Sequence, residues 1–304
     1  MQDIKILIIG GTGTLGQEIC RQLGDQDRIV IYSRDEYKQA QMRKEFPEGG
    51  DHGIRYFIGD VRDQERLYQA MYDVDLVIHA AAMKRIDTCE YEPIETMKTN
   101  IQGSMNVIKA CRGAKVQKCI LVSTDKAVDP VSIYGASKLV AEKLFISANI
   151  FKGTRFSVVR YGNVLGSRGS ILQTWEQQLK EHKKITITDP EATRFFFTIQ
   201  TATQFVLSKL ESMTGGEIFI PKMESKSILE MALSMTSSAN LEFTGFRCPE
   251  KLHEELITNY EATQCYDQGD CFCIYPEFHS WRKELAYQGK HVRLDFTYSS
   301  KDIS

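Results

Sequence analysis

A stretch near the amino terminus decides the fold: Lys5-Ile6-Leu7-Ile8-Ile9-Gly10-Gly11-Thr12-Gly13-Thr14-Leu15-Gly16. Its first five residues form an apolar run typical of a buried strand, and helical spacing follows over 16–23. Glycines between a strand and a helix let the backbone turn sharply and approach a pyrophosphate, to which the helix start offers free N–H groups. The alternative is a glycine turn that binds nothing. We expect a dinucleotide-binding loop made of Gly10, Thr12, Gly13, Thr14, Leu15 and Gly16.

Strand-like and helix-like segments alternate outward from this loop. Apolar, β-branched runs predict strands, and amphipathic spacing between them predicts helices. This order predicts an α/β fold, with a doubly wound parallel sheet of the Rossmann type. The expected strands are 5–9, 28–32, 55–58, 76–79, 118–122 and 155–160, and the expected helices are 16–23, 62–71, 94–111 and 137–149.

The pattern loosens after Gly162, where a loop rich in glycine and serine precedes a helix that begins near residue 171. A further helix over 201–212 is long enough to return to the sheet. We therefore expect a dinucleotide-binding Rossmann domain over 1–160 plus 195–220. A smaller, mixed C-terminal lobe over 161–194 plus 221–304 is expected to bind the substrate.

The composition excludes several classes of protein. The 304 residues carry 38 basic and 40 acidic side chains, whereas a nucleic-acid-binding protein would show a one-sided basic patch. The sequence has no apolar stretch of the roughly 20 residues that cross a membrane, and no signal-peptide pattern. We therefore expect a cytoplasmic protein with neither nucleic acid nor membrane as a partner.

The eight cysteines do not form a disulfide framework in a chain of this length. The cluster Cys265, Cys271 and Cys273 leaves open a zinc site or a group of reduced thiols. Because 271–275 reads as a strand and no second ligand pair follows, we favour reduced thiols and expect no metal.

The end of the second expected strand distinguishes two nicotinamide cofactors. NAD sites place an acidic side chain there for the ribose hydroxyls, whereas NADP sites place cationic and small polar groups around the 2′-phosphate. Here the strand ends in Ser33-Arg34-Asp35, and Lys38 follows one helical turn later. Arg34 offers a planar fork to a phosphate, so we expect NADP, although Asp35 favours NAD.

Two more segments at strand ends are expected to contact the cofactor. An acidic side chain after the third strand can bind the adenine amino group. Small side chains after the fourth strand leave room for the dinucleotide, although they fit plain tight packing equally well. These residues are Asp60, Val61, Ala80, Ala81 and Ala82.

The candidate catalytic residues lie near the fifth strand. Tyr134 and Lys138 have the i, i+4 spacing that puts a phenol and an ammonium on one helix face. A neighbouring cation and the nicotinamide charge lower the pKa of a tyrosine, so Tyr134 can accept a proton from a sugar hydroxyl. Thr124 supplies a hydroxyl that positions the substrate oxygen. Asp125 and Lys126 follow directly, and an adjacent acid and base suit an elimination, the alternative being an ion pair that caps the strand.

Together these residues resemble the soluble UDP-N-acetylglucosamine 4,6-dehydratases, a polysaccharide biosynthesis family of the extended short-chain dehydrogenase/reductase type. The resemblance extends from Ile6 to Ser300. Besides the segments quoted above, it is carried by Gly59-Asp60-Val61-Arg62-Asp63, Ser123-Thr124-Asp125-Lys126-Ala127, Arg160-Tyr161-Gly162-Asn163-Val164, Gly166-Ser167-Arg168-Gly169-Ser170, Thr193-Arg194-Phe195 and Glu250-Lys251-Leu252-His253-Glu254.

The resemblance implies a UDP-sugar substrate and a reaction in three stages. NADP takes hydride from C4 while Tyr134, supported by Lys138, acts as the base. Lys126 then removes the C5 proton, Asp125 protonates the departing C6 hydroxyl, and the hydride returns to C6. Family members that invert C5 keep a tyrosine at the position of Tyr134, which implies UDP-2-acetamido-2,6-dideoxy-β-L-arabino-hex-4-ulose as the product.

The resemblance also implies further binding residues and a homo-oligomer, a dimer or larger. Lys84 and Val164 are expected at the cofactor. The residues expected at the substrate are Lys84, Thr124, Asn163, Arg168, Gly169, Ser170, Arg194, Arg247 and Glu250.

Other functions remain open on the sequence. A nucleotide-sugar 4-epimerase shares every feature except a use for Asp125 and Lys126, and a C5-retaining dehydratase shares the elimination. A non-catalytic NADP-binding regulator would usually lack Tyr134 or Lys138, and both are present.

Overall fold

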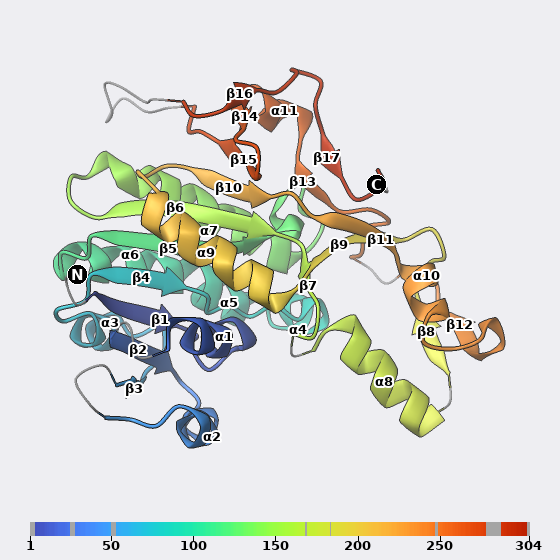
Figure 1. The fold of residues 1–304 in the computed structure, drawn as a ribbon, viewed down its shortest axis with the longest axis horizontal. Coiled ribbons are helices and arrows are strands. Elements are labelled where there is room, and N and C mark those ends of the chain that lie inside the picture. Colours follow the sequence, from blue (N-terminus) through green and yellow to red (C-terminus); the bar gives the residue numbers. More distant parts are fainter. Residues whose placement is uncertain are drawn as a thin grey trace.

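The computed structural model describes residues 4–24, 28–49, 53–167, 169–182, 184–246, 249–277 and 287–302. Its main feature is one large sheet (Figure 1). The strands of this sheet are β1 (Lys5–Ile9), β2 (Arg28–Ser33), β3 (Arg55–Ile58), β4 (Leu76–His79), β5 (Lys118–Thr124), β6 (Arg155–Tyr161), β10 (Ile218–Pro221), β14 (Cys265–Asp267), β15 (Cys271–Ile274) and β16 (Lys290–His291).

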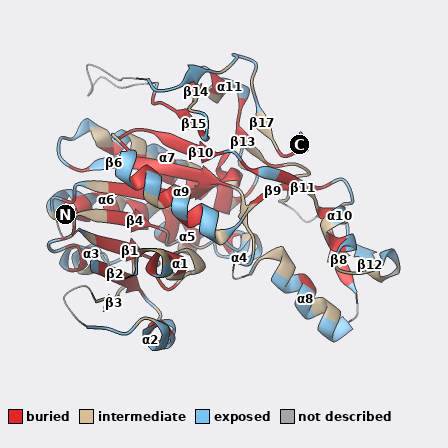
Figure 2. Ribbon diagram, in the orientation of Figure 1, coloured by how far each residue is buried: buried red, intermediate tan, exposed pale blue. Residues whose placement is uncertain are grey.

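The sheet order is β16-β14-β15-β10-β6-β5-β4-β1-β2-β3. The seven neighbouring strands β10, β6, β5, β4, β1, β2 and β3 run parallel to one another. Strand β15 pairs antiparallel with β10, and β14 and β16 continue the sheet with antiparallel pairs. The order 3-2-1-4-5-6 is that of a Rossmann sheet, whose ligands bind where the strand order reverses, beside β1 and β4. The fold class predicted from the sequence is therefore confirmed. Figure 2 shows why the strands read as continuous apolar runs, since both faces of the sheet are buried.

Helices cover both faces of the sheet. Helices α1 and α9 pack on one face, and α3, α6 and α7 pack on the other (Figure 1). The expected return of the helix near 201–212 is confirmed, because α9 contacts β5 and β6. The helices are α1 (Thr14–Leu23), α2 (Glu36–Glu45), α3 (Gln64–Ala70), α4 (Ile86–Tyr91), α5 (Pro93–Met97), α6 (Gly103–Gly113), α7 (Ile133–Ser147), α8 (Ile171–His182), α9 (Ile199–Ser212), α10 (Ile228–Leu233) and α11 (Asn259–Ala262).

Several helices differ from the sequence prediction in their bounds. Helix α3 begins later than expected because the Asp63 side chain caps it, accepting from the Arg66 N–H at 2.9 Å. The segment expected as one helix over 94–111 contains α5, a π-helical turn over Lys98–Gln102, and α6. Helix α7 begins earlier than 137, since the Ser132 hydroxyl caps it by accepting from the Gly135 N–H at 3.1 Å. Tyr134 consequently lies in the first turn of α7.

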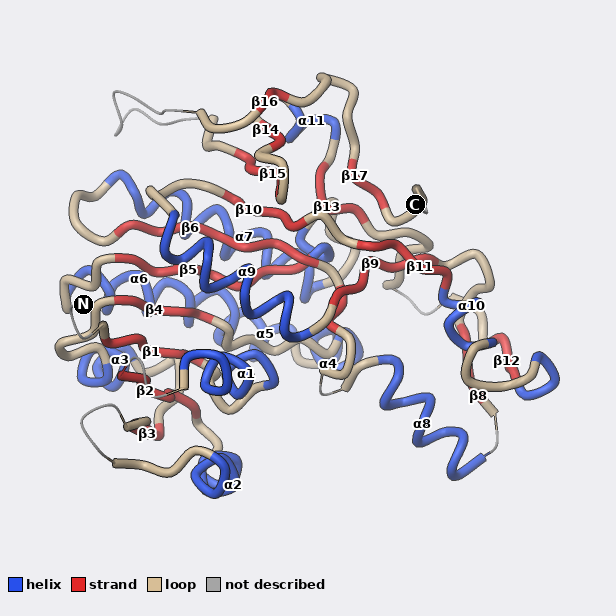
Figure 3. Tube along the Cα trace, in the orientation of Figure 1, coloured by secondary structure: helices blue, strands red, loops and turns tan. Residues whose placement is uncertain are grey.

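The remaining strands lie beyond the carboxyl ends of the parallel strands, where loops connect them to the sheet (Figure 3). Trp175, Ile185, Phe196 and Ile228 belong to a second, smaller core there. Strands β14, β15 and β16, which lie within the range of the expected mixed lobe, extend the main sheet. The strands outside that sheet are β7 (Asn163–Val164), β8 (Ile185–Ile187), β9 (Thr193–Phe197), β11 (Glu224–Ser227), β12 (Leu241–Phe243), β13 (Glu255–Ile257) and β17 (Tyr298–Ser299).

A buried ion-pair network ties the C-terminal region to the sheet. The Arg160 guanidinium on β6 lies 2.7 Å from a Glu142 oxygen on α7 and 2.9 Å from a Glu261 oxygen on α11. Because Arg160 and Glu142 are fully buried, removing either partner would leave an unpaired charge in the core. In the described part of the chain, no helix combines the length and apolar composition of a membrane span.

Candidate active site

The glycine loop brings the ends of β1 and β4 into backbone contact. Gly10 has φ +83°, and a Cβ atom there would lie 2.8 Å from the Ala81 nitrogen. A Cβ atom on Gly16 would lie 2.1 Å from the Gly11 oxygen, so a larger residue would force the loop open. Gly13 is the N-cap of α1, and the first turn of that helix carries no acidic side chain. The start of α1 therefore directs backbone N–H groups and positive charge to the edge where β1 and β4 end, as a pyrophosphate requires.

The end of β2 leaves an exposed cation beside this loop. The Arg34 side chain is 62% exposed, and its guanidinium lies 3.8 Å from Asp60 Oδ2. Asp35 is used locally as the N-cap of α2, accepting from the Lys38 N–H at 3.0 Å and pairing with Lys38 Nζ at 2.8 Å. Asp60 binds Arg62 at 2.7 Å; burial alone would raise its pKa, but the Arg62 contacts lower it overall. At the end of β2, Asp35 is therefore engaged by Lys38, while the Arg34 guanidinium is largely exposed.

Thr124, Asp125 and Lys126 lie together where β5 ends, in a short 3₁₀ turn over Asp125–Ala127. The Thr124 hydroxyl donates to Asp125 Oδ1 at 2.9 Å, and Lys126 Nζ donates to the same oxygen at 3.0 Å. Asp125 is fully buried, and its Oδ2 has no hydrogen-bond partner among the described residues. A Cβ atom on Gly162 would lie 3.2 Å from that oxygen.

Tyr134 and Lys138 lie on α7 beside this turn, but their surroundings differ from the sequence expectation. Lys138 Nζ donates to the Val122 carbonyl at 2.8 Å, and burial lowers the pKa of Lys138 to about 8. Burial raises the pKa of Tyr134 to about 12, and the cation that opposes this rise is Lys126. The tyrosine was expected to owe a lowered pKa to its neighbouring cation and the nicotinamide charge. In the folded protein, desolvation by burial outweighs the opposing charge of Lys126.

A pocket of about 100 Å³ opens beside Lys126. Three expected substrate residues, Asn163, Arg194 and Glu250, line it together with Lys126. Arg194 is buried, and its guanidinium donates to the carbonyls of Thr193, Leu252 and Lys251 at 2.7 to 2.9 Å. The full lining is Ile86, Lys126, Val131, Ser132, Asn163, Arg194, Pro249, Glu250, Lys251 and Glu254.

Glu254 is the functional candidate that the sequence prediction missed. Its Oε1 lies 3.3 Å from Lys126 Nζ and 3.9 Å from Arg194 Nε, and its side chain is 4% exposed. The residue was visible in the motif Glu250-Lys251-Leu252-His253-Glu254, but its sequence distance from Lys126 hid the contact. Its neighbour His253 contacts the Thr193 hydroxyl at 2.7 Å.

Other expected site residues lie elsewhere or outside the description. The lining of the small pocket does not include Gly169, Ser170 or Lys84. Gly169 and Ser170 precede α8, and Lys84 is exposed in the loop before α4. Val164 on β7 packs against the main core. Arg168 and Arg247 lie outside the described residues.

The cysteine cluster is buried in the antiparallel part of the sheet. Cys271 and Cys273 lie on β15, as the strand prediction indicated, and Cys265 lies on the neighbouring β14. Burial raises the pKa of Cys271 to about 11 and that of Cys265 to about 12. Among the described residues, no three histidine, cysteine or acidic side chains are grouped as metal ligands.

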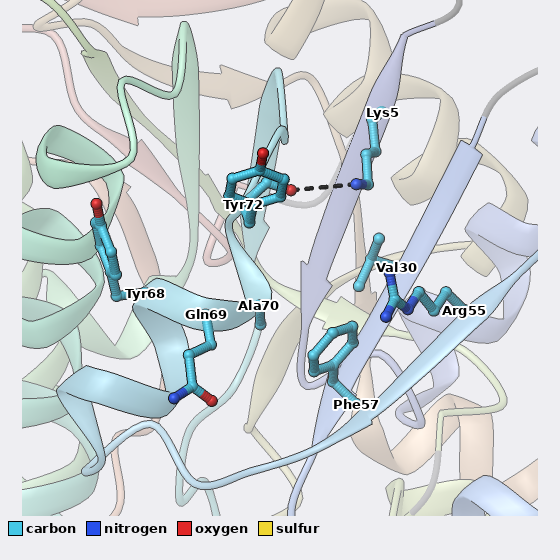
Figure 4. A pocket seen from close by; sticks show the side chains of 8 residues that line it. All are labelled: Lys5, Val30, Arg55, Phe57, Tyr68, Gln69, Ala70 and Tyr72. Atoms are coloured by element: carbon cyan, nitrogen blue, oxygen red, sulfur yellow. Dashed lines mark hydrogen bonds between the residues drawn. The ribbon is translucent and has the colours of Figure 1, made fainter.

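A larger pocket lies at the opposite edge of the sheet, where β1 and β3 begin. It has a volume of about 380 Å³ and includes Lys5, Arg55, Phe57, Tyr68 and Tyr72 (Figure 4). Lys5 Nζ donates to the Tyr72 carbonyl at 3.1 Å across its mouth. Because dinucleotide folds bind ligands at the carboxyl ends of their strands, this pocket is separate from the candidate active site.

Comparisons with known proteins identify relatives of this chain. A model of the family described as "Polysaccharide biosynthesis protein" matches residues 6–276. The chain is 45% identical over 310 residues to a Campylobacter jejuni protein named UDP-N-acetylglucosamine 4,6-dehydratase (inverting), with 97% of this chain and 92% of the relative covered. It is 39% identical over 285 residues to a Rickettsia bellii protein named UDP-glucose 4-epimerase, covering 90% and 83%.

One solved structure is similar over almost its whole length. The X-ray structure of Pen from Bacillus thuringiensis superposes with a TM-score of 0.90 at 38% identity, covering 98% of this chain and 93% of that one. The matched range of the family model includes both the glycine loop and the Thr124–Lys138 region. The chain belongs to the polysaccharide biosynthesis protein family.

Proposed function

We propose that this protein is a UDP-N-acetylglucosamine 4,6-dehydratase that inverts C5 of the sugar. The observation that carries the proposal is the pairing of Lys126 Nζ with Asp125 Oδ1 at 3.0 Å, beside Thr124 and open to a pocket. An epimerase needs no second acid and base, whereas an elimination needs both. The Campylobacter relative, at 45% identity, carries the same proposed activity in its name.

The proposed cofactor is NADP, held by Gly10 to Gly16 and by Arg34. The close approach of Gly10 to Ala81 and the exposed Arg34 guanidinium support this choice. When bound, NADP supplies the hydride acceptor for C4 and the hydride donor for C6. We propose cofactor binding by 1–160 plus 195–220 and sugar-nucleotide binding by 161–194 plus 221–304. Within the second range, strands β14 to β16 extend the main sheet.

The protein's own side chains supply the proton transfers. Tyr134 accepts the proton of the C4 hydroxyl, Thr124 positions that oxygen, and Lys138 supports Tyr134 from the same helix face. Lys126 removes the C5 proton, which the new ketone has made acidic, and Asp125 protonates the C6 hydroxyl as it leaves. Because inversion returns a proton to the opposite face of C5, Tyr134 is the proposed donor or relay there.

Incubation with UDP-N-acetylglucosamine in deuterated water tests the proposal. We expect the sugar to lose water and to gain deuterium at C5. Proton NMR at the earliest times should show the L-arabino 4-ketose. Only the D-xylo ketose would make the enzyme a retaining dehydratase. An epimerised sugar with neither change would instead support the 4-epimerase activity in the name of the Rickettsia relative.

We further propose that the protein is a cytoplasmic homo-oligomer. Light scattering of the purified protein measures its molar mass and so tests whether it is an oligomer.

A further inference from the structure

Three charged side chains from distant parts of the sequence meet at the pocket. Lys126 Nζ lies 3.0 Å from Asp125 Oδ1 and 3.3 Å from Glu254 Oε1. Both carboxylates are buried, with side chains 0% and 4% exposed. One ammonium is therefore shared by two carboxylates that water scarcely reaches.

This sharing opposes the chemistry that the proposed function asks of Lys126. Although burial favours the neutral amine, Asp125 and Glu254 together hold the pKa of Lys126 above its usual range. A protonated Lys126 cannot remove the C5 proton. The reaction needs an amine at Lys126 and a carboxylic acid at Asp125, the reverse of the ion pair.

A single proton transfer converts one arrangement into the other. An N–H bond of Lys126 breaks and an O–H bond forms on Asp125, across the 3.0 Å contact and without any other reactant. A negative Glu254 opposes this transfer because it stabilises the ammonium by direct attraction. A neutral Glu254 removes that attraction, and a buried site then favours the uncharged pair of amine and acid.

The surroundings of Glu254 allow it to be neutral. Its Oε2 is buried and has no hydrogen-bond partner in the described structure. Lys126 and Asp125 face it from the turn after β5, Arg194 faces it from β9, and Lys251 lies three residues before it. Burial and the Asp125 charge raise the pKa of Glu254, and they outweigh the three cations.

We propose that Glu254 gates the dehydration step: a neutral Glu254 lets Lys126 pass its proton to Asp125, and an ionised Glu254 locks Lys126 as an ammonium. Glu254 acts through Lys126 and is a positioning residue. The inference rests on the proposed dehydratase function.

The variant Glu254→Gln tests the gate, because glutamine copies the neutral acid but cannot ionise. In the wild-type enzyme, the rate of water loss should fall as pH rises through the Glu254 pKa, since the active form is the protonated one. The variant should lack this fall in rate at high pH, which is the alkaline limb of the pH profile. One pH unit above the midpoint of the wild-type fall, the variant should lose water roughly tenfold faster than the wild type. Glu255→Gln makes the same change at the next residue and should keep the wild-type profile. A Glu254→Gln enzyme that keeps the limb, or that eliminates no water at any pH, overturns the proposal.

Two further measurements keep the test independent of folding and of the proposed function. Glu254→Asp retains an ionisable group of lower intrinsic pKa, so its alkaline limb should shift to lower pH. Infrared pH-difference spectra of the ligand-free protein should contain a carboxylic acid band that Glu254→Gln removes and Glu255→Gln preserves. Absence of that band overturns the gate. A wild-type enzyme that makes no dehydrated product refutes the dehydratase function, while the infrared result still decides whether Glu254 holds a proton beside Lys126.

Discussion

A Cβ atom on Gly135 would lie 2.1 Å from the carbonyl oxygen of Lys126. The first turn of α7 therefore packs backbone to backbone against the turn that carries Asp125 and Lys126. This contact fixes Tyr134, one residue earlier on α7, relative to Lys126 on the turn after β5.

Gly135→Ala should disturb both stability and catalysis. The new methyl group must push the start of α7 away from Lys126, and overpacking of this kind costs about 1–3 kcal/mol of unfolding free energy. We expect turnover to fall further than stability alone explains, because Tyr134 moves with the helix. Urea unfolding and turnover measure the two effects. Gly113→Ala is the control, since its Cβ atom would meet only the exposed Tyr68 ring, at 3.0 Å; an equal loss in both variants would contradict the prediction.

Arg34→Ala should weaken NADP binding roughly 10- to 100-fold, because a hydrogen bond between charged groups contributes about 1.5–3 kcal/mol. NAD binding should change little, since NAD lacks the 2′-phosphate. Titration of the purified protein with each cofactor gives the two dissociation constants. Arg43→Ala removes the same charge from α2, where Arg43 pairs with Glu48, and should leave both constants unchanged. An unaltered NADP/NAD ratio in Arg34→Ala would exclude a role for Arg34 in cofactor choice.

Lys126→Ala should separate oxidation from elimination. The variant lacks the proposed C5 base, so water loss should slow by at least about 100-fold, while Tyr134 and Lys138 still support oxidation at C4. Stopped-flow absorbance should record NADPH that persists without a 6-deoxy product. Thermal unfolding should be measured alongside, because the variant leaves Asp125 and Glu254 without their shared cation. Normal dehydration by a folded variant would show that the ion pair only caps β5.

His79 should make stability depend on pH. Burial, aided by the charge of Lys138, lowers the pKa of His79 to about 3 in the folded protein, from 6.5 in the unfolded chain. The unfolded state therefore binds the proton first, and stability is lost as pH falls below about 6.5. Between pH 7 and pH 5 this effect amounts to about 2 kcal/mol of unfolding free energy.

Urea unfolding of His79→Gln at both pH values tests this account. The variant should lose the part of the pH dependence that His79 causes, whereas His182→Gln, at an exposed position, should behave as the wild type. Equal pH dependence in all three proteins would show that His79 is not the group responsible.

The sequence by itself determined the strands of the Rossmann sheet and the glycine loop. A buried parallel strand needs a continuous apolar run, and Lys5–Ile9, Arg28–Ser33 and Leu76–His79 supply such runs locally. The placement of Tyr134 and Lys138 on one helix face followed from spacing alone. The ends of the helices did not follow from the spacing, because capping by Asp63 and Ser132 shifted the starts of α3 and α7 by a few residues.

Only the tertiary structure decided how the charged residues are used. Arg194 was expected at the substrate; it lines the small pocket, and its guanidinium also donates to the carbonyls of Leu252 and Lys251. Glu254 meets Lys126 because the segment before β13 returns to the end of β5, a contact that no local pattern encodes. Hydrophobic periodicity reports which residues are buried, whereas ion pairs between distant segments depend on the packing of the whole chain. For that reason the sequence predicted that Asp125 and Lys126 lie together at the end of a strand, and the structure alone placed Glu254 beside them.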